Sequence, residues 1–444
     1  MTILDTIVED KKKQLKTLED EYKDHILSYT AHEKRSLIKA IEKNHNISII
    51  AEIKRGSPSK GLFADNLDIE EQVKIYNSGA SAISVLTDEN FFFGSFKDLR
   101  KVRELTTLPI LCKDFIVDKI QLQIAASMGA DLVLLIANVL PPKELSFLLN
   151  EAHKLGLEVL VEVHTLEEFE KIKDLDFTLC GVNNRNLEDF TVSLDTTKAL
   201  ADYIKASGKL VITESGIHSK SQLEELRPYH IDAALIGESL IKQSSLLNTL
   251  KLRKEPVKIK LCGLKTTAQA IVAESLQVDY IGLVFAKSKR QITINQALEI
   301  RAQIKQSKLV GVFKNQSPKY IEDIYNSCKL DFIQIHGSFD FNALEIPKSK
   351  IIRAIHYKEI HPQGFNSILF DGPRPGSGQS YNCDDINLMD NQNYILAGGL
   401  TSGNVVDKLQ TLKVQAVDVS SGIEKEGTKD IELMKEFVDK VRSI

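Results

Sequence analysis

The chain contains no Trp and little Gly or Pro, and these absences point to an ordinary folded protein. Its 444 residues include only 23 Gly and 11 Pro, a smaller share than average usage, which excludes collagen-like and low-complexity sequences. A disordered chain would combine few apolar residues with a large net charge. This chain is 43% hydrophobic and has a formal net charge of -4. We therefore expect enough apolar material for more than one core.

Cysteine is scarce as well. The five cysteines are far apart and form no Cys-x-x-Cys pair, so neither a disulfide framework nor a zinc site is predicted. His153 and His164 belong to no carboxylate framework, and we interpret them as ordinary surface or loop residues. The dinucleotide pattern Gly-x-Gly-x-x-Gly is absent from the first strand-to-helix turns. We expect no metal and no cofactor.

The sequence also lacks an excess of basic residues and any long apolar run. Its 57 Lys and Arg are balanced by 61 Asp and Glu, whereas a nucleic-acid binder needs an excess of positive charge. The longest apolar run, Leu132 to Ala137, has the length of a strand and not the ~20 residues of a membrane helix. The first residues contain no apolar signal core. We expect a soluble cytoplasmic protein without nucleic-acid or membrane partners.

After residue 47, short apolar runs alternate with amphipathic stretches. This pattern is typical of buried parallel strands joined by crossover helices. Eight such runs begin near Ser48, Ser81, Pro109, Asp131, Leu157, Thr178, Lys209 and Asp232. Eight βα units without a composition break favour a closed (β/α)8 barrel, or TIM barrel, over an open doubly wound sheet. Residues 3 to 43 are predicted to form additional helices outside the barrel.

The apolar periodicity lapses between Lys251 and Pro256, and the count of strands then restarts. Eight further runs begin near Val257, Asp279, Lys308, Asp331, Lys350, Ser367, Asn393 and Gln415. The connection from Tyr357 to Asn366 is too short for a full crossover helix. The predicted fold class is α/β, with two tandem (β/α)8 TIM barrels over residues 1–254 and 255–444 and extra N-terminal helices on the first.

The predicted strand ends of the first half carry a concentration of charge. Active sites of βα barrels lie at the C-terminal ends of the strands and in the loops that follow. Five charged residues from four strands would converge on one mouth: Glu52, Lys54, Lys113, Glu162 and Glu214. Crowded ammonium and carboxylate groups shift one another's pKa values and supply proton donors and acceptors. Ser215, Gly216 and Gly237 follow the last two strands, where barrels bind phosphate.

These motifs resemble those of the indole-3-glycerol-phosphate synthase family, in the family's order, over residues 1 to about 253. The matching segments are Ala51-Glu52-Ile53-Lys54 with Ser57-Pro58-Ser59, Lys113-Asp114-Phe115-Ile116, Asn183-Asn184-Arg185 and Glu214-Ser215-Gly216-Ile217. Gly56 stands where the family more often has a larger residue. The family decarboxylates 1-(2-carboxyphenylamino)-1-deoxyribulose 5-phosphate and closes its ring, releasing carbon dioxide and water.

The resemblance implies a role for each matching residue. Lys113 resembles the general acid that activates the substrate ketone, and Glu162 resembles the acid/base residue of the dehydration step. Glu52 and Lys54 would assist in charge stabilisation and proton transfer. The residues implied in substrate binding are Ser57, Asn183, Arg185 and Glu214, and those implied in phosphate binding are Ser215, Gly216, Gly237 and Ser239.

The second half places a thiol, an acid and clusters of small residues at its predicted strand ends. A cysteine on an apolar strand is most often inert core. Cys262, however, ends the first strand, where its thiolate could act as a base if nearby positive charge lowers its pKa. Asp371 ends the sixth strand. Small residues follow the later strands, the last two groups at the expected phosphate site: Gly376-Ser377-Gly378, Gly398-Gly399-Leu400 and Ser420-Ser421-Gly422.

Residues 257 to 444 resemble the phosphoribosylanthranilate isomerase family. The matching signatures are Lys260-Leu261-Cys262-Gly263, Ser288-Lys289-Arg290, Gln334-Ile335-His336-Gly337, Asp371 and Asp418-Val419-Ser420-Ser421-Gly422-Ile423-Glu424. Lys289 stands where proline is common in the family. The family carries out an Amadori rearrangement, in which an aldose N-glycoside becomes a ketose.

Here too the resemblance implies roles. Asp371 resembles the acid that opens the ribose ring, and Cys262 resembles the base that takes a proton from the adjacent sugar carbon. Arg290 would contact the anthranilate carboxylate. Gln334 and His336 would complete the substrate site, and phosphate would be bound by Gly378, Gly398, Gly399, Ser420, Ser421 and Gly422.

The two resemblances fit together because the isomerase product is the synthase substrate. We therefore expect a bifunctional, cofactor-free and monomeric enzyme of tryptophan biosynthesis that acts on phosphorylated small molecules. One alternative is a pair of phosphosugar barrels from another pathway, such as the isomerases of histidine biosynthesis. These would carry aspartates at the first and fifth strand ends, where this chain has Glu52 and Cys262, and Glu162 and Arg353. Another alternative is that one half is a non-catalytic barrel that binds a phosphorylated metabolite.

Overall fold

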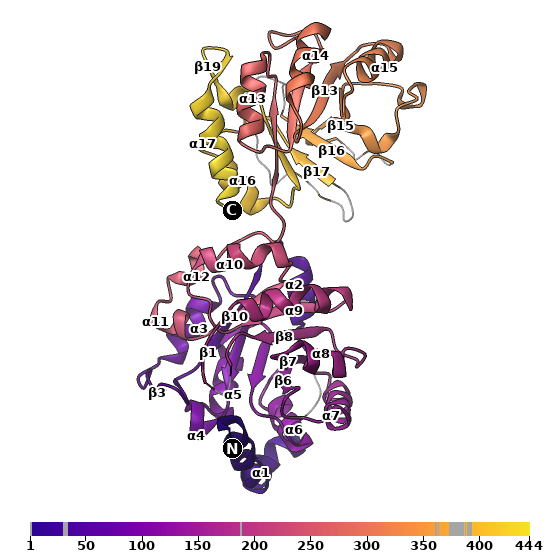
Figure 1. Ribbon diagram of the computed structural model, residues 1–444. Helices are drawn as coiled ribbons and strands as arrows, with labels where there is room; N and C mark the ends of the chain where they lie inside the picture. The colour runs from indigo at the N-terminus through magenta and orange to yellow at the C-terminus, as the bar shows by residue number, and fades with distance from the viewer. Residues whose placement is uncertain are drawn as a thin grey trace. The chain divides into compact units, whose positions relative to one another are not determined.

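The chain forms two closed barrels, each built from eight parallel strands (Figure 1). The structure, a computed structural model, describes residues 2–29, 34–186, 189–359, 362, 364–372, 386, 388 and 393–444. It divides into two compact units, Met1–Glu255 and Pro256–Ile444. The predicted fold of two tandem (β/α)8 barrels is confirmed.

In the first barrel each strand pairs with the next, and the last strand pairs with the first. The strands are β1 (Ser48–Ile53), β4 (Ala82–Leu86), β5 (Ile110–Lys113), β6 (Leu132–Ile136), β7 (Glu158–Val163), β8 (Leu179–Asn183), β9 (Leu210–Glu214) and β10 (Ala233–Ile236). Each begins within one residue of its predicted position. Almost all strand residues are buried, because a closed parallel sheet is covered on both faces, and this explains the continuous apolar runs.

Helices and one short hairpin connect these strands. The hairpin consists of β2 (Gly56–Ser57) and β3 (Gly61–Leu62). The helices are α3 (Ile69–Tyr76), α4 (Glu89–Phe92), α5 (Phe96–Leu105), α6 (Lys119–Ser127), α7 (Pro142–Lys154), α8 (Leu166–Ile172), α9 (Asp195–Ala206), α10 (Lys220–Leu226), α11 (Glu238–Lys242) and α12 (Leu246–Thr249). Asp68, Ser95 and Asp118 are the N-cap residues of α3, α5 and α6. Their side chains accept hydrogen bonds from free backbone N–H groups in the first turn, which favours the start of a helix at these positions.

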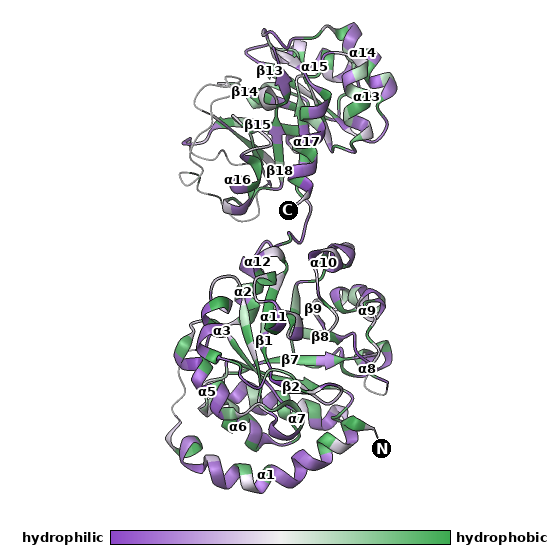
Figure 2. Ribbon diagram, turned by 90° about the vertical axis from the view of Figure 1, so that its left-hand side faces the viewer, coloured by the Kyte–Doolittle hydropathy of each residue, from purple (hydrophilic) through white to green (hydrophobic). Residues whose placement is uncertain are grey.

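Two helices precede the first barrel, as predicted: α1 (Ile3–Ser28) and α2 (Leu37–Lys43). Helix α1 is mostly hydrophilic (Figure 2), yet it buries Lys11. Lys11 Nζ lies 2.9 Å from Asp88 Oδ2 and 2.9 Å from Asp114 Oδ1. Burial lowers the pKa of Lys11, but the two carboxylates outweigh burial and raise it. Because Asp88 follows β4 and Asp114 follows β5, this ion group fixes α1 at the C-terminal end of the barrel.

The second barrel repeats this architecture, with fewer helices among its described residues. Its strands are β11 (Lys258–Cys262), β12 (Tyr280–Val284), β13 (Lys308–Lys314), β14 (Phe332–His336), β15 (Ile351–His356), β16 (Ser367–Asp371), β17 (Asn393–Leu396) and β18 (Ala416–Val419). Its helices are α13 (Thr267–Ser275), α14 (Ile294–Gln303), α15 (Pro318–Ser327), α16 (Val405–Thr411) and α17 (Ile431–Arg442). A short hairpin of β19 (Glu424–Lys425) and β20 (Thr428–Lys429) follows β18.

Two connections of the second barrel are shorter than a full βα unit. Between β14 and β15 only the 3-10 turns η2 (Phe341–Ala343) and η3 (Lys348–Lys350) are present, a feature that the apolar pattern did not predict. The described residues between β15 and β16 contain no helix, in agreement with the short connection expected there. None of the helices in the described ranges combines the length and the apolar character needed to cross a membrane.

Lys11→Met should destabilise the first barrel by about 3–5 kcal/mol, because removal of one partner leaves buried carboxylates without a compensating charge. Lys12→Met, on the exposed side of α1, is the matched control and should change stability by less than about 0.5 kcal/mol. Urea unfolding followed by circular dichroism measures both. Equal effects of the two substitutions would show that the buried ion group does not hold α1 in place.

Candidate active sites

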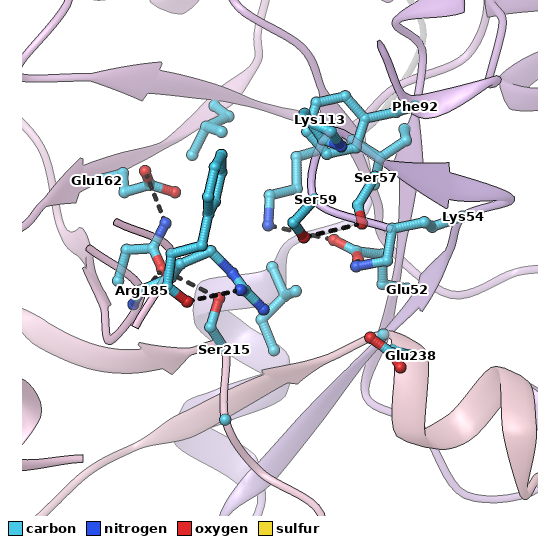
Figure 3. Close-up of a pocket in the computed structure, with 18 of the residues that line it drawn as sticks. Glu52, Lys54, Ser57, Ser59, Phe92, Lys113, Glu162, Arg185, Ser215 and Glu238 are labelled. Carbon is cyan, nitrogen blue, oxygen red and sulfur yellow. Dashed lines mark hydrogen bonds and ion pairs between the residues drawn. The ribbon is translucent and has the colours of Figure 1, made fainter. Parts of the chain in front are cut away.

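The charged residues predicted at the mouth of the first barrel surround one pocket (Figure 3). They come from the C-terminal ends of β1, β5, β7 and β9, which are alternate strands of the closed barrel. The predicted residues that line it are Glu52, Lys54, Ser57, Lys113, Glu162, Asn183, Arg185, Ser215, Gly216, Gly237 and Ser239. Glu214 is the exception, because its side chain is fully buried and does not line the pocket. Its Oε1 occupies the space that a Cβ at Gly181 would take.

An ion network lies at the base of this pocket. Lys113 Nζ lies 3.1 Å from Glu52 Oε2 and 3.0 Å from Glu214 Oε2. Lys54 Nζ lies 2.7 Å from Glu52 Oε1. Lys113 therefore contacts two carboxylates from two other strands, and Glu52 contacts two ammonium groups. The side chain of Glu214 contacts Lys113 from beneath the pocket, and the role in substrate binding that the family resemblance implies for Glu214 stays a prediction.

Burial and charge shift the pKa values of this network in opposite directions. Burial raises the pKa of Glu52, but Lys113 and Lys54 outweigh it and hold that pKa at about 2. Burial lowers the pKa of Lys113, but Glu52 and Glu214 raise it above its ordinary value. Burial raises the pKa of Glu214 to about 7 despite Lys113, and Glu214 Oε1 has no hydrogen-bond partner among the described residues. At neutral pH the pocket thus contains a Lys113 ammonium and a Glu52 carboxylate.

Glu162 has two neighbours at the opposite side of the pocket. Its Oε1 accepts a hydrogen bond from Asn183 Nδ2 at 3.2 Å, and His164 Nε2 lies 3.6 Å from the same oxygen. His164 is a loop residue between β7 and α8, as one of the two predicted alternatives had it, but it is not a surface residue, since its side chain is only 12% exposed. It lies between Glu162 and Glu168 at the start of α8. Burial lowers the pKa of His164, whereas both carboxylates raise it, and the net shift is upward.

Small residues follow β9 and β10 beside the ion network, and those after β9 form a tight turn. Ser215 and Gly216 have φ values of 66° and 87°, and this left-handed backbone is costly for residues with a side chain. Ser215 Oγ donates a hydrogen bond to Asn183 Oδ1 at 3.0 Å. A Cβ at Gly237 would overlap Glu52 Oε1. A glycine is therefore required here by close packing, in addition to any contact with an anion.

An apolar wall completes the first pocket, and it was not predicted from the sequence. Helix α1 contributes Ile3, Leu4 and Ile7, and the barrel contributes Phe92, Phe115, Leu134, Ile136 and Phe190. The ring centroids of Phe92 and Phe115 are 5.8 Å apart. A pocket with one charged and one apolar side suits a ligand that has an aromatic ring at one end and polar groups at the other. Phe115, which directly follows Lys113-Asp114, was the one signal available in the sequence.

Gly56, the departure from the family pattern, has a local structural reason. A Cβ at this position would overlap the ring of Phe93. Phe93 has a φ of 58° and packs its ring over the hairpin formed by β2 and β3. The absence of a side chain at Gly56 therefore permits this contact.

A second pocket lies at the mouth of the second barrel. The predicted residues that line it are Cys262, Arg290, Gln334, His336, Asp371, Gly398, Gly399, Ser420 and Ser421. Gly422 does not line it, because its Cα packs against the Leu400 carbonyl oxygen, which a Cβ would overlap. Gly378 lies outside the described residues. Lys287, Lys314 and Asp418 line the pocket as well and were assigned no role from the sequence.

Asp371 and His336 have pKa values shifted by burial in opposite directions. Burial raises the pKa of Asp371 to about 6, although the Gly372 N–H donates to its Oδ1 at 2.8 Å. Burial, together with Lys260, lowers the pKa of His336 to about 4. His336 Nδ1 lies 3.7 Å from Asp371 Oδ2, and Gln334 Nε2 lies 2.8 Å from His336 Nε2. Asp371 therefore stays protonated at a pH closer to neutral than an ordinary aspartate does.

Arg290 already has a carboxylate partner within the chain. Its Nε lies 2.6 Å and its Nη2 2.9 Å from the two oxygens of Glu424. Lys429 Nζ lies 2.9 Å from Glu424 Oε1 and also donates to Ser420. The guanidinium group of Arg290 thus binds the Glu424 carboxylate through two parallel hydrogen bonds. The sequence did not reveal Glu424 as this partner.

Each barrel thus gathers ionisable side chains and small residues in a pocket at the C-terminal end of its strands, which is the arrangement of a pair of (β/α)8-barrel enzymes on one chain. Comparison with known families agrees. The profile of indole-3-glycerol phosphate synthase matches residues 4–252. The profile of N-(5'phosphoribosyl)anthranilate (PRA) isomerase matches residues 259–440.

Relatives span nearly the whole chain. The tryptophan biosynthesis protein TrpCF of Helicobacter pylori is 32% identical over 446 residues, covering 95% of this chain and 95% of that protein. TrpCF of Vibrio parahaemolyticus is 36% identical over 429 residues, covering 92% and 87%. The crystal structure of phosphoribosyl anthranilate isomerase from Thermus thermophilus is 27% identical and covers 42% of this chain and 99% of that one, with a TM-score of 0.39.

The chain belongs to the TrpCF family, with an N-terminal indole-3-glycerol phosphate synthase and a C-terminal phosphoribosylanthranilate isomerase. It is a bifunctional enzyme of tryptophan biosynthesis, a lyase and an isomerase on one chain, and this expectation is confirmed.

Glu214→Gln should stabilise the first barrel increasingly as pH rises from about 5 to about 8. The folded-state pKa of Glu214 is raised to about 7, so wild-type folding becomes less favourable as this carboxyl must ionise, while Gln never does. Melting temperatures of both proteins across this range measure the effect. Glu19→Gln, on the exposed side of α1, is the control and should show no such trend. A constant difference between Glu214→Gln and wild type would contradict the raised pKa.

Proposed function

We propose that the first pocket closes the indole ring with Lys113 as the proton donor. The observation that supports this role is the Lys113 ammonium held between Glu52 and Glu214 at the pocket base. The substrate's ring carbon that bears the carboxylate attacks the ketone carbon, and Lys113 transfers a proton to the ketone oxygen. Carbon dioxide then leaves, and its bonding electron pair restores the aromatic ring. Glu52 stabilises the positive charges on Lys113 and Lys54 throughout.

Dehydration completes the first reaction. The new hydroxyl receives a proton from Glu162 and leaves as water, and the neighbouring carbon gives up a proton to the Glu162 carboxylate as the double bond of the indole forms. We assign both proton transfers to Glu162, which Asn183 holds by a hydrogen bond. The aromatic ring of the substrate would lie against Phe92 and Phe115, with its carboxylate near Lys54. The other substrate contacts in this proposal are Ser57 and Arg185 for the sugar chain and Ser215, Gly216, Gly237 and Ser239 for the phosphate.

The second pocket is proposed to carry out the Amadori rearrangement with Asp371 as acid and Cys262 as base. Asp371 protonates the ribose ring oxygen, the ring opens, and a Schiff base forms between the sugar and the anthranilate nitrogen. Cys262 then takes the proton from the adjacent sugar carbon, and the resulting enolamine becomes the ketone. The raised pKa of Asp371, about 6, supports its role as the acid.

Substrate binding in the second pocket would use the remaining lining residues. Arg290 is proposed to bind the anthranilate carboxylate, and its bidentate contact with Glu424 would hold the guanidinium group in place at the pocket. Gln334 and His336 would orient the sugar. The phosphate would be held at the turns formed by Gly398, Gly399, Ser420 and Ser421.

Cys262→Ala should lower isomerisation by about 10²–10⁴-fold and leave ring closure near the wild-type rate. Lys113→Ala should have the reverse effect. Isomerisation is followed by the change in anthranilate fluorescence, and ring closure by the appearance of indole-glycerol phosphate from the ketose substrate. Loss of both activities in one folded single variant would refute the assignment of separate sites.

We further propose that the enzyme acts as a monomer in the cytoplasm. Each proposed site consists of residues from this one chain, and the buried cysteines Cys112, Cys180, Cys262 and Cys328 are free thiols, as a reducing compartment maintains them. Sedimentation equilibrium should give a mass near 49.7 kDa. A particle of about twice that mass at micromolar concentration would contradict the monomer.

A further inference from the structure

One fully buried lysine of the second barrel has no role in the reaction described above. Lys260 lies two residues before Cys262 on β11, and alternate residues of a strand point to the same side. Lys260 is 0% exposed. Its Nζ lies 3.0 Å from Asp418 Oδ1, and the two residues are directly paired between β11 and β18. A buried ammonium is expensive without such a partner, so the fold maintains this charge inside the barrel.

The ammonium of Lys260 lies beside the thiol of Cys262. Both groups meet over Gly282, which pairs with Cys262 between β11 and β12. A Cβ at Gly282 would lie 2.7 Å from Cys262 Sγ and 3.0 Å from Lys260 Nζ. The two groups also influence each other electrostatically, because Cys262 raises the pKa of Lys260 and Lys260 lowers the pKa of Cys262. The lack of a side chain at Gly282 thus leaves the space in which these two groups meet.

Other charged groups face the same thiol from neighbouring elements. Lys429 on β20 lowers the pKa of Cys262, but its ammonium is already paired with the carboxylate of Glu424. Burial and Asp418 raise the pKa of Cys262, whereas Lys260 and Lys429 lower it. The ionisable side chains around Cys262 are Lys260, Asp418, Lys429, Arg290, His336 and Asp371. Among them, Lys260 places its ammonium beside the sulfur, over Gly282.

We propose that Lys260, anchored by Asp418, is a positioning residue that stabilises the thiolate of Cys262 and so makes this cysteine a competent base. The inference deepens the proposed function of the second pocket and rests on it. The Lys260 ammonium keeps its proton throughout, and the proton that Cys262 removes from the sugar carbon resides on sulfur. Asp418 keeps Lys260 in place, but its own negative charge opposes the thiolate. The two partners therefore act on Cys262 in opposite directions.

Lys260 and Asp418 affect the Cys262 thiolate in opposite directions, so substitutions of the two should change its reactivity in opposite directions. Purely structural roles would not produce this difference. The full chain is treated with iodoacetamide at about pH 8, and alkylation of the Cys262 peptide is timed by mass spectrometry, since only the thiolate reacts. Lys260→Met should slow alkylation by about tenfold or more, which corresponds to a rise of at least one pKa unit. Asp418→Asn keeps an amide oxygen that can accept the hydrogen bond of the Lys260 ammonium but removes the negative charge that opposes the thiolate, so it should maintain or increase the rate. Lys258→Met, an exposed position on the same strand, should leave it unchanged.

The outcomes separate this inference from the function on which it rests. A Lys260→Met protein that folds and alkylates at the wild-type rate overturns the inference. Slower alkylation in Asp418→Asn also overturns it, and this variant decides the matter if Lys260→Met does not fold. Isomerisation should fall in Lys260→Met, while ring closure on the same chain stays unchanged. If instead Cys262→Ala retains isomerisation, the proposed base is wrong, whatever the alkylation rates show.

Discussion

Closure of each sheet into a barrel is the constraint on which the rest of the structure depends. Because β1 pairs with both β10 and β4, and β11 with both β12 and β18, all strand ends of a unit form one ring. Glu52 and Glu214 are far apart in sequence, yet both contact the ammonium of Lys113. Residues with chemical roles therefore need only occupy the last positions of their strands to meet.

Both proposed sites depend on an ammonium group held within the barrel by carboxylates. In the first barrel, Lys113 lies between two carboxylates and retains its proton until a ketone oxygen approaches. In the second, Asp418 holds Lys260, whose ammonium lies beside the thiol of Cys262 over Gly282. The same arrangement serves a proton donor in one unit and a proton acceptor in the other. In each case a glycine on an adjacent strand, Gly181 or Gly282, leaves the space that the buried groups occupy.

The strands of both barrels could be predicted because burial on both faces turns each strand into an apolar run with polar residues at its end. The same rule identified Lys113, Cys262 and Asp371 as residues of the mouths. Features that depend on side-chain packing could not be predicted. The position of Glu214 beneath its pocket follows from the missing Cβ of Gly181, and the burial of His164 follows from contacts with Glu162 and Glu168. The apolar wall from α1 needed the tertiary contact made by Lys11, which sequence spacing does not reveal.

The central claim is that two separate sites on one chain catalyse consecutive steps. Its most direct test is a mixture of two variants, Cys262→Ala and Lys113→Ala, each impaired in one step only, supplied with phosphoribosylanthranilate. If the sites are separate, each variant carries out the step that the other has lost, and the mixture forms indole-glycerol phosphate much faster than either protein does alone. If both variants are folded and the mixture forms this product no faster than either protein alone even at high protein concentration, the two steps do not occur at separate sites, and the account is contradicted.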